Sequence, residues 1–237
     1  MQSALGVFYP PQCVSCEART DTDFALCGDC WRDTPFIEGL VCDLCGDPLP
    51  GDDDETVHCD ACLATDRPWS QGRAAMLYKG NARRLILTLK HGDRPELARA
   101  AAPWLARAAT PLIRLDTIIV PMPIHWSRLF RRRYNQSVEL ARAMANLLQL
   151  DHAPDAIVRP KRTRAHDGMD IAARFANMQD AIGPHPKSSG ALAGRNVLLL
   201  DDVMTSGASF DAATRACLAA GADHVNVLAL ARVTRDA

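Results

Sequence analysis

Four Cys-X-X-Cys pairs within the first 62 residues constrain the fold of this chain more than any other feature. They account for eight of its nine cysteines: Cys13/Cys16, Cys27/Cys30, Cys42/Cys45 and Cys59/Cys62. Such a turn brings two thiolates to one side of a tight knuckle, and two knuckles complete a tetrahedral four-cysteine zinc site. Gly28 and Gly46, at the knuckles, help the backbone to turn. The sequence therefore predicts two structural Zn²⁺ sites.

The spacing alone allows two ways of sharing the cysteines between the ions. The simpler one is sequential, with the first four cysteines on one ion and the next four on the other; a cross-braced arrangement joins alternate pairs. A disulfide scaffold is disfavoured because the N-terminal residues do not resemble an export signal and the knuckle spacing suits metal. His58, beside Cys59, could serve as a substitute ligand, but it is expected to be a neighbour of the site or an exposed histidine. Cys217 is expected to be a small buried residue of a helix.

Charge divides the chain into two parts. Residues 1–70 hold 14 acidic and 3 basic side chains, a balance of −11, whereas residues 71–237 have a balance of +10 and the whole chain −1. We therefore predict a zinc module over residues 1–70 and a larger domain over residues 71–237. The first module is too poor in aliphatic residues to fold without metal. Its acidity disfavours contact with DNA phosphates and favours a structural or partner-binding role, for instance as an adaptor for a helicase.

Beyond residue 70, apolar runs alternate with amphipathic segments, a pattern typical of βαβ units around a parallel sheet. Expected strands cover residues 73–79, 116–121, 156–159, 196–201 and 224–232. Expected helices cover residues 81–90, 95–109, 135–150 and 208–220, the first with Asn81 as its N-cap. We predict an α/β domain whose ligand binds beyond the carboxyl ends of the strands.

The run VLLLDDVMTSGAS, residues 197–209, is the most informative segment of the larger domain. Its apolar residues deliver Asp201 and Asp202 to the edge of the sheet, where carboxylates can accept hydrogen bonds from the vicinal hydroxyls of a ribose. The residues that follow enter a helix and offer backbone N–H groups and hydroxyls suited to a phosphate: Thr205, Ser206, Gly207, Ala208 and Ser209. A sugar phosphate bridging both features explains the whole run.

This run resembles the 5-phosphoribosyl-1-pyrophosphate (PRPP) signature of type I phosphoribosyltransferases. The chain as a whole is similar to the ComF family, whose members join a four-cysteine zinc-ribbon module to that fold. The similarity includes the run VPMPIHWSRLFRRRYNQSVELARAMA at 120–145, the RTRA run at 162–165, and Arg174 and Asn177. Two departures are visible: Arg133 stands where the family usually has glycine, and residues 165–173 are shorter and lack the usual glutamine.

The resemblance implies a PRPP-dependent enzyme that transfers a 5-phosphoribosyl group to a nitrogen acceptor and releases pyrophosphate. By motif position, Asp201 and Asp202 would hold the ribose hydroxyls, and residues 205–209 the 5′-phosphate. The turn at Met122 and Pro123 corresponds to the family's pyrophosphate loop, with Lys90 and Arg128 as its basic candidates. Mg²⁺ would enter with PRPP, held mainly by its oxygens and by water.

A second set of residues suggests a different function. Between residues 128 and 164, nine basic side chains face three acidic ones: Arg128, Arg131, Arg132, Arg133, Arg142, Arg159, Lys161, Arg162 and Arg164. Such a strip suits single-stranded DNA, with Trp126 and Tyr134 as candidate stacking residues, although charge runs are also common on solvated surfaces. The family's association with competence makes a non-enzymatic DNA-handling factor the alternative to the enzyme. Free thiolates and PRPP both predict a cytoplasmic protein without membrane insertion.

Overall fold

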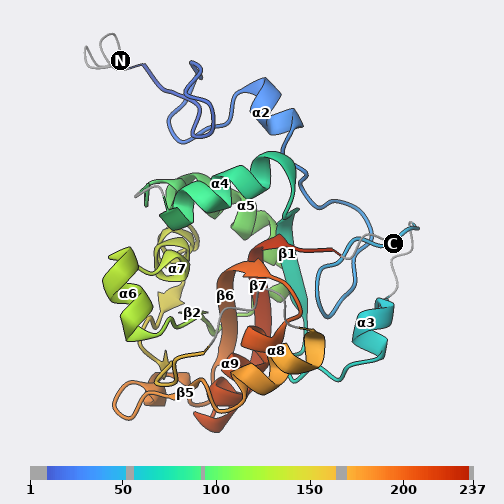
Figure 1. Cartoon of the computed structure of the whole chain (residues 1–237), viewed down its shortest axis with the longest axis vertical. Coiled ribbons are helices and arrows are strands. Elements are labelled where there is room, and N and C mark those ends of the chain that lie inside the picture. Colours follow the sequence, from blue (N-terminus) through green and yellow to red (C-terminus); the bar gives the residue numbers. More distant parts are fainter. Residues whose placement is uncertain (1–9, 52–55, 92–93, 164–169, 235–237) are drawn as a thin grey trace.

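The computed structural model describes residues 10–51, 56–91, 94–163 and 170–234, and its centre is a five-stranded parallel sheet (Figure 1). The strand order is β1-β7-β6-β2-β3. These strands are β1 (Gly72–Leu77), β2 (Thr117–Pro121), β3 (Asp151–His152), β6 (Asn196–Met204) and β7 (His224–Arg232). In the centre of the sheet, Leu199 pairs with Val120 on one side and Val227 on the other. A short antiparallel pair, β4 (Ile157–Val158) and β5 (Gly183–Pro184), lies apart from the sheet.

Helices cover both faces of the sheet, and each face has its own buried core. One core joins the sheet to α4 (Gly80–His91), α5 (Leu97–Ala109) and α7 (Gln136–Leu148). The other joins it to α8 (Ile171–Met178), α9 (Ala208–Ala219) and the second half of the cysteine module. Successive residues of β6 alternate between these cores, Leu198 and Leu200 in the first, Val197 and Leu199 in the second, which is the two-residue period of a strand. The expected fold class is confirmed.

The remaining elements are short. They are α2 (Gly28–Arg32), α3 (Asp60–Leu63), α6 (Trp126–Arg132) and two 3₁₀ turns, η1 (Thr110–Leu112) and η2 (Ser189–Leu192). Most strands and the long helices lie within a few residues of their expected bounds, but α6, α8, β3 and β5 are additions to the expected order. The strand expected over residues 156–159 is β4, which pairs with β5 outside the parallel sheet. No helix in the described part of the chain is long and apolar enough to span a bilayer.

The two halves of the cysteine module pack on opposite faces of the sheet. Val14, from the first half, belongs to the core with α4 and α5, whereas Cys42, Cys45, Cys59 and Cys62 belong to the core with α9. The linking segment lies along β1, where Ile37 N–H donates to the Ala75 carbonyl and Leu77 N–H to the Pro35 carbonyl. Because these contacts cross residue 70, the predicted boundary separates two parts of one packed molecule; the division itself stays a prediction.

The approach of the module to β1 is so close that only glycine fits at two positions. A Cβ on Gly72 would lie 2.3 Å from the Leu44 carbonyl oxygen. A Cβ on Gly46, whose φ is +68°, would lie 2.8 Å from the backbone nitrogen of Ala74. The second pair of knuckles is therefore pressed directly against the backbone of the sheet.

The expectation that Asn81 caps a helix from outside was wrong. Helix α4 begins at Gly80, and Asn81 is buried inside its first turn. Its amide nitrogen donates to Thr34 Oγ1 at 2.9 Å and to the Cys30 carbonyl at 3.2 Å, and its side-chain oxygen accepts from Ser15 Oγ. Asn81 thus ties the first pair of knuckles to the domain, because its three hydrogen-bond partners belong to residues far from it in the sequence.

Candidate functional site

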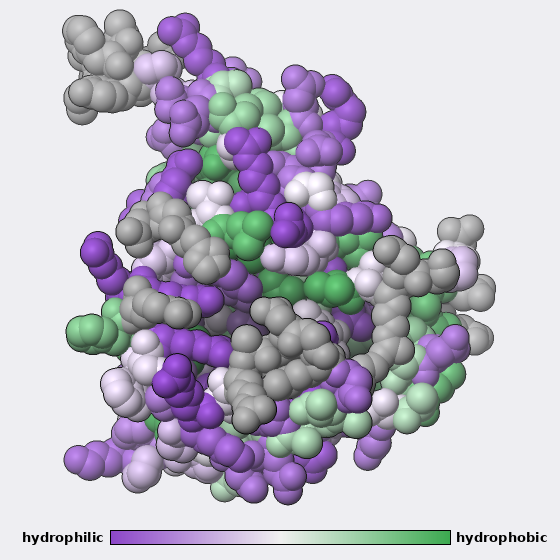
Figure 2. Space-filling model, in the orientation of Figure 1, coloured by the Kyte–Doolittle hydropathy of each residue, from purple (hydrophilic) through white to green (hydrophobic). Residues whose placement is uncertain are grey.

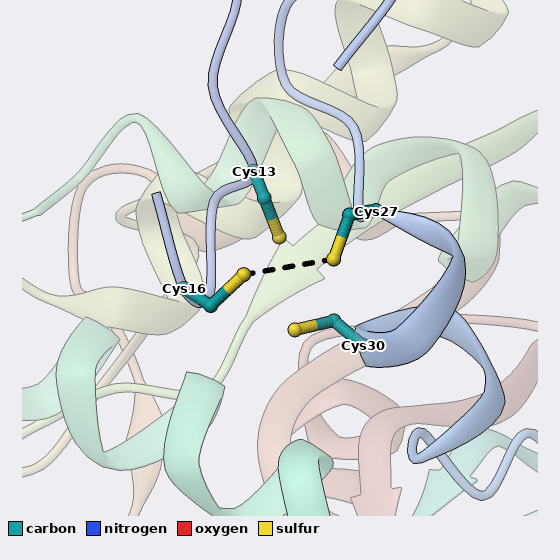
Figure 3. A group of neighbouring side chains, drawn as sticks. All are labelled: Cys13, Cys16, Cys27 and Cys30. Atoms are coloured by element: carbon teal, nitrogen blue, oxygen red, sulfur yellow. Dashed lines mark hydrogen bonds between the residues drawn. The ribbon is translucent and has the colours of Figure 1, made fainter. Parts of the chain in front are cut away.

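The eight knuckle cysteines form two groups, which we call the first cluster (Cys13, Cys16, Cys27, Cys30) and the second cluster (Cys42, Cys45, Cys59, Cys62). Figure 3 shows the four sulfurs of the first cluster converging on one point. Within each cluster all sulfurs lie within 4.8 Å of one another. The sequential partition is confirmed, and the cross-braced alternative does not occur.

The sulfur spacing fits zinc. Four sulfurs at about 2.3 Å from one ion stand about 3.8 Å apart. The Cys16 and Cys27 sulfurs are 3.5 Å apart, and those of Cys45 and Cys59 are 3.7 Å apart. These distances are far too long for a disulfide, and all the cysteines are free thiols. Both clusters therefore fit structural Zn²⁺.

The surroundings of the two clusters differ. Cys16 of the first cluster is exposed, and Cys27 and Cys30 are half-buried, whereas all four cysteines of the second cluster are buried. His58 is exposed and belongs to neither cluster. Cys217 is buried in α9, as expected, and its burial raises the pKa of the thiol to about 12. The second cluster is thus part of the core, whereas the first lies at the surface.

Asp201 and Asp202 lie inside β6, three residues further from its end than the sequence suggested. On one side β7 continues to pair with β6 as far as Met204 and Arg232. On the other side pairing with β2 stops at Leu200 and Pro121, so the two aspartates come just beyond the end of β2. They therefore lie at the carboxyl end of the sheet on its β2 side, where ligands of such sheets bind.

The two carboxylates have different partners. Asp201 Oδ1 accepts hydrogen bonds from Ser137 Oγ at 2.7 Å and from the Asp202 N–H at 2.8 Å. Asp202 makes an ion pair with Lys90, whose Nζ lies 3.0 Å from its Oδ1. Burial and the charge of Asp202 raise the pKa of Asp201 to about 7, against the opposite influence of Ser137, the Asp202 N–H and Lys90. Lys90 is thus already paired with Asp202 in the absence of a ligand.

A second cationic group lies near these carboxylates. Burial and the charge of Arg128 lower the pKa of Arg159 to about 10, against the attraction of Asp201. Arg159 also donates to Thr163 Oγ1, and Arg128 to the Thr163 carbonyl at 3.4 Å. Arg159 therefore lies near Asp201, with Arg128 as its neighbour, and only Arg128 was a candidate from the sequence. Arg159 was one of many basic residues there, and no local pattern distinguished it.

Residues 205–207 join β6 to α9, and Ala208 and Ser209 are the first two residues of that helix; we call all five the 205–209 loop. Gly207 has φ +86° and directly precedes α9 as its N-cap. A Cβ at this position would lie 2.9 Å from Arg67 Nη1 and 3.0 Å from the Trp69 ring, so the loop requires glycine for both its conformation and its space. Ala208 N–H lies 3.5 Å from Ser206 Oγ. The five residues form the predicted strand–loop–helix junction, with the N-terminus of α9 behind it.

Met122 and Pro123 are both buried at the end of β2. The Met122 N–H donates to the Leu200 carbonyl at 2.8 Å, and proline has no N–H. The backbone N–H groups at these two positions therefore cannot serve as donors to a ligand, and their contribution is to set where the following turn begins. Residues 164–169, which include most of the shortened 165–173 stretch, lie outside the described residues.

Four consecutive residues, Tyr134 to Ser137, hold these groups in place, and sequence reasoning gave a role only to Tyr134, as a stacking candidate. Tyr134 OH donates to the Leu89 carbonyl and Gln136 Nε2 to the Lys90 carbonyl at 3.5 Å, which anchors the end of α4. Asn135 caps α7 through the Ser137 N–H and donates to the Met122 carbonyl at 3.0 Å. The only signal was their place in the YNQS part of the family block. Tyr134, a candidate for base stacking, is thus occupied with the backbone of α4.

The basic residues of the strip have different surroundings. Arg142 pairs with Glu139 on α7, Arg159 is half-buried, and Lys161 donates to the Gln179 carbonyl. The Arg131 side chain and all of Arg164 lie outside the described part of the chain. On α6 and at its end, Arg128, Arg132 and Arg133 lie among exposed apolar side chains: Trp126 (71% exposed), Leu129 (43%) and Phe130 (89%). Figure 2 shows hydrophobic surface projecting at this edge between hydrophilic side chains.

Comparison with known proteins gives relatives over nearly the whole chain. A family model described as a double zinc ribbon domain matches residues 4–63. Competence protein F of Haemophilus influenzae is 25% identical over 231 residues, 95% of this chain and 98% of that protein. DNA utilization protein YhgH of Escherichia coli is 28% identical over 215 residues, 88% and 91% of the two chains. The resemblance to the ComF family is confirmed.

Two solved structures are also similar to part of this chain. Glutamine PRPP amidotransferase from Bacillus subtilis has a TM-score of 0.41 at 13% identity, over 61% of this chain and 30% of that chain. Adenine phosphoribosyltransferase from Thermoanaerobacter pseudethanolicus has a TM-score of 0.37 at 14% identity, over 60% and 83% of the two chains.

Proposed function

Since this chain is similar over most of its length to competence protein F and to DNA utilization protein YhgH, we propose that it binds PRPP and transfers the 5-phosphoribosyl group to a nitrogen nucleophile. The observation that carries the proposal is the junction of Asp201 and Asp202 with the 205–209 loop at the carboxyl end of the sheet. In the reaction the bond between ribose C1 and the pyrophosphate oxygen breaks, a bond from C1 to nitrogen forms, and the nucleophile loses a proton.

The residues around the junction suit the separate parts of PRPP. Asp201 and Asp202 can accept hydrogen bonds from the 2′ and 3′ hydroxyls, and the 205–209 loop with the N-terminus of α9 can hold the 5′-phosphate. We assign Lys90, which pairs with Asp202, and Arg128 to the leaving pyrophosphate. Arg159 adds a third positive charge near Asp201. Carboxylates are also oxygen ligands of the kind Mg²⁺ takes, and Mg²⁺ supplies charge neutralisation for pyrophosphate when it is bound.

The test is a calorimetric titration of the zinc-loaded chain with PRPP and Mg²⁺. Wild type should bind, and the double variant Asp201→Asn/Asp202→Asn should lose binding because an amide accepts hydrogen bonds more weakly than a carboxylate. The matched control is Asp151→Asn, which changes an exposed aspartate of β3 that pairs with Arg195. No binding by well-folded wild type would reject the proposal, and bound PRPP would justify a screen of nitrogen acceptors.

A second candidate function, single-stranded DNA binding, is favoured by α6. Trp126 and Phe130 stand four residues apart, hence on one face of the helix, and both are largely exposed. Arginines lie on the same helix and at its end, so stacking and phosphate contacts can come from one surface. The printed names of the relatives, competence and DNA utilization, agree with this function.

The DNA function is tested by anisotropy of a labelled oligothymidine. Trp126→Ala/Phe130→Ala should weaken binding by roughly tenfold or more, since stacking contributes about 1–3 kcal/mol per base. Trp31→Ala removes a half-exposed tryptophan from the acidic module and should leave the affinity for the oligonucleotide unchanged. Affinity that is independent of salt, or equal losses in both variants, would reject this surface. An adaptor role of the zinc module toward a helicase stays a prediction.

A further inference from the structure

Two arginine side chains donate hydrogen bonds to backbone carbonyls of the 205–209 loop. Arg232, the last residue of β7, donates from Nη1 to the Thr205 carbonyl at 2.6 Å. Arg67, from the segment that follows the second cluster, donates from Nη1 to the Ser206 carbonyl at 3.0 Å. Arg232 is only 6% exposed, and the Arg67 guanidinium lies over the rings of Trp69 and Phe175 at 5.3 and 5.8 Å. Both side chains are therefore held in place before a ligand arrives.

These bonds determine which way the loop's N–H groups point. In a trans peptide the carbonyl of one residue and the N–H of the next point in opposite directions. Holding the carbonyls of Thr205 and Ser206 toward the arginines therefore turns the N–H groups of Ser206 and Gly207 away from them. Two consecutive N–H groups that share one direction are what an anion site needs. The arginines thus orient the donors without touching the anion.

The same two side chains connect the loop to the second cluster. Arg232 Nη2 lies 3.4 Å from Cys45 Sγ, and its Nε lies 3.8 Å from Asp47 Oδ1. Trp69, which stands against Gly207, donates its indole N–H to the Leu44 carbonyl at 2.6 Å, inside the Cys42–Cys45 knuckle. The knuckle, the two arginines and the loop are therefore in direct contact.

We propose that Arg67 and Arg232 are positioning residues of the phosphate loop, and that the metal-loaded second cluster is the support that holds them. Zinc occupancy of that cluster and phosphate binding at the loop are then coupled, and each strengthens the other by the same factor. This inference rests on the proposed function in assuming that the 205–209 loop binds the 5′-phosphate. It adds that the second cluster of the zinc module orients the loop for binding phosphate.

The test uses the full zinc-loaded chain and ribose 5-phosphate, which contains the ribose and phosphate of PRPP and lacks its pyrophosphate. Calorimetry compares wild type, Arg67→Gln and Arg232→Gln. Each variant should raise the Kd about tenfold or more, because it removes a charge-assisted hydrogen bond that orients the loop. The matched control is Arg73→Gln. Arg73, in β1, contacts the same knuckle by donating to the Asp43 carbonyl at 2.9 Å and to Asp43 Oδ1 at 2.7 Å. The Kd of the Arg73→Gln variant for ribose 5-phosphate should change less than about twofold.

A second measurement reads the metal itself. Release of zinc to a coloured chelator is followed with and without saturating ribose 5-phosphate. In wild type the ligand should slow the release of one of the two zinc equivalents, and in Arg232→Gln this protection should disappear. If Arg232→Gln does not bind two zinc ions, the same measurement is made on Arg232→Lys and Arg67→Gln instead. The lysine variant is chosen because it keeps a positive charge beside Cys45.

The outcomes separate the inference from the proposed function. If wild type binds neither PRPP nor ribose 5-phosphate, the proposed function fails. If wild type binds and the Arg67 and Arg232 variants bind equally well with unchanged zinc protection, the inference alone is wrong. Weaker binding by Arg73→Gln as well, to the same degree, would also overturn it, since general loosening of the module would then explain the losses.

Discussion

Asp201 shares the end of a buried strand with a second carboxylate, and this makes its protonation the most sensitive single property of the site. Burial and the charge of Asp202 raise its pKa to about 7. Ser137, the Asp202 N–H and Lys90 act in the other direction, and Arg159 lies nearby as a further cation. Without ligand, the carboxyl is therefore about half protonated near neutral pH.

We expect the affinity for PRPP to rise between pH 6 and pH 8. A protonated carboxyl accepts hydrogen bonds from ribose hydroxyls poorly, so binding of PRPP favours the ionised form and releases a proton. Calorimetry across this range should show a slope of up to about tenfold per pH unit below the pKa of Asp201. Asp201→Asn provides the comparison, because the titration of the ligand's own phosphate remains in it. Parallel profiles for the two proteins would contradict the assignment.

The same shift affects the stability of the unliganded protein. The native state keeps a proton on Asp201 that the unfolded state releases above the ordinary value of 3.8, so the free energy of unfolding should fall as pH rises from about 4 to about 7. Asp201→Asn cannot titrate and should melt at a higher temperature than wild type at pH 8, with a smaller difference at pH 5. Scanning calorimetry at both values measures this, and an equal difference at the two would count against the raised pKa.

Arg133 holds a backbone conformation that glycine adopts more easily. It is the C-cap of α6, with φ +68°, so the left-handed conformation is kept although the family's usual glycine is absent. Arg133→Gly should raise the free energy of unfolding by about 1 kcal/mol, measured by urea denaturation, since a Cβ disfavours this region. Arg133→Ala keeps the Cβ and should bring no such gain; an equal gain would point to charge instead.

Among the elements, α4 and α7 cooperate in placing Lys90. The run from Tyr134 to Ser137 leads into α7, which begins at Gln136. Its side chains also donate hydrogen bonds to carbonyls in the last turn of α4, where Lys90 lies. Helix ends leave carbonyls without partners inside the helix, so such bonds determine where the last turn stays ordered. The position of the cation facing Asp202 therefore depends on a different helix from the one that carries it.

Tyr134→Phe tests this dependence. Removing the hydroxyl leaves the Leu89 carbonyl without this donor and should cost about 1 kcal/mol of unfolding free energy. Hydrogen exchange should show faster opening of the last turn of α4, and PRPP should bind severalfold more weakly because Lys90 is less well placed. Tyr78→Phe, at the end of β1, serves as control. Unchanged exchange in α4 with lost affinity would mean that Tyr134 acts by another route.

At the scale of the whole molecule, the two clusters support different things. The second cluster is buried in the core with α9 and β6, whereas the first lies on the α4 side with Cys16 exposed. A buried ion contributes to the stability of everything packed around it, and a peripheral one contributes mainly to its own loop. The two zinc ions should therefore differ in how far the effect of their loss spreads.

Cys42→Ser and Cys16→Ser separate these roles. Cys42→Ser should lower the free energy of unfolding of the sheet by several kcal/mol, while Cys16→Ser should cost clearly less, each losing one zinc equivalent. Scanning calorimetry with zinc analysis measures both, and hydrogen exchange in β6 shows whether the effect reaches the sheet. Equal losses would mean that the first cluster is also part of the cooperative core.

Local patterns in the sequence determined much of this protein. The Cys-X-X-Cys pairs predicted two metal clusters, because a knuckle is complete within four residues. The apolar runs predicted the strands and long helices within a few residues, because burial on a two- or 3.6-residue period is recorded locally. The acidic pair and the loop residues of the candidate site stand consecutively in the chain, so their pattern was visible as well.

Tertiary structure alone decided what these segments touch. Helix α6 was missed because its apolar side chains face outward, and β6 runs to Met204 because β7 pairs with it there. Ser137 and Asp201 are 64 positions apart, and Arg67 and Ser206 are 139 apart. Sequence periodicity indicates which face of an element is buried but not which surface covers it. The partners of the carboxylates and of the 205–209 loop therefore became visible only once the sheet, the helices and the second cluster were packed together.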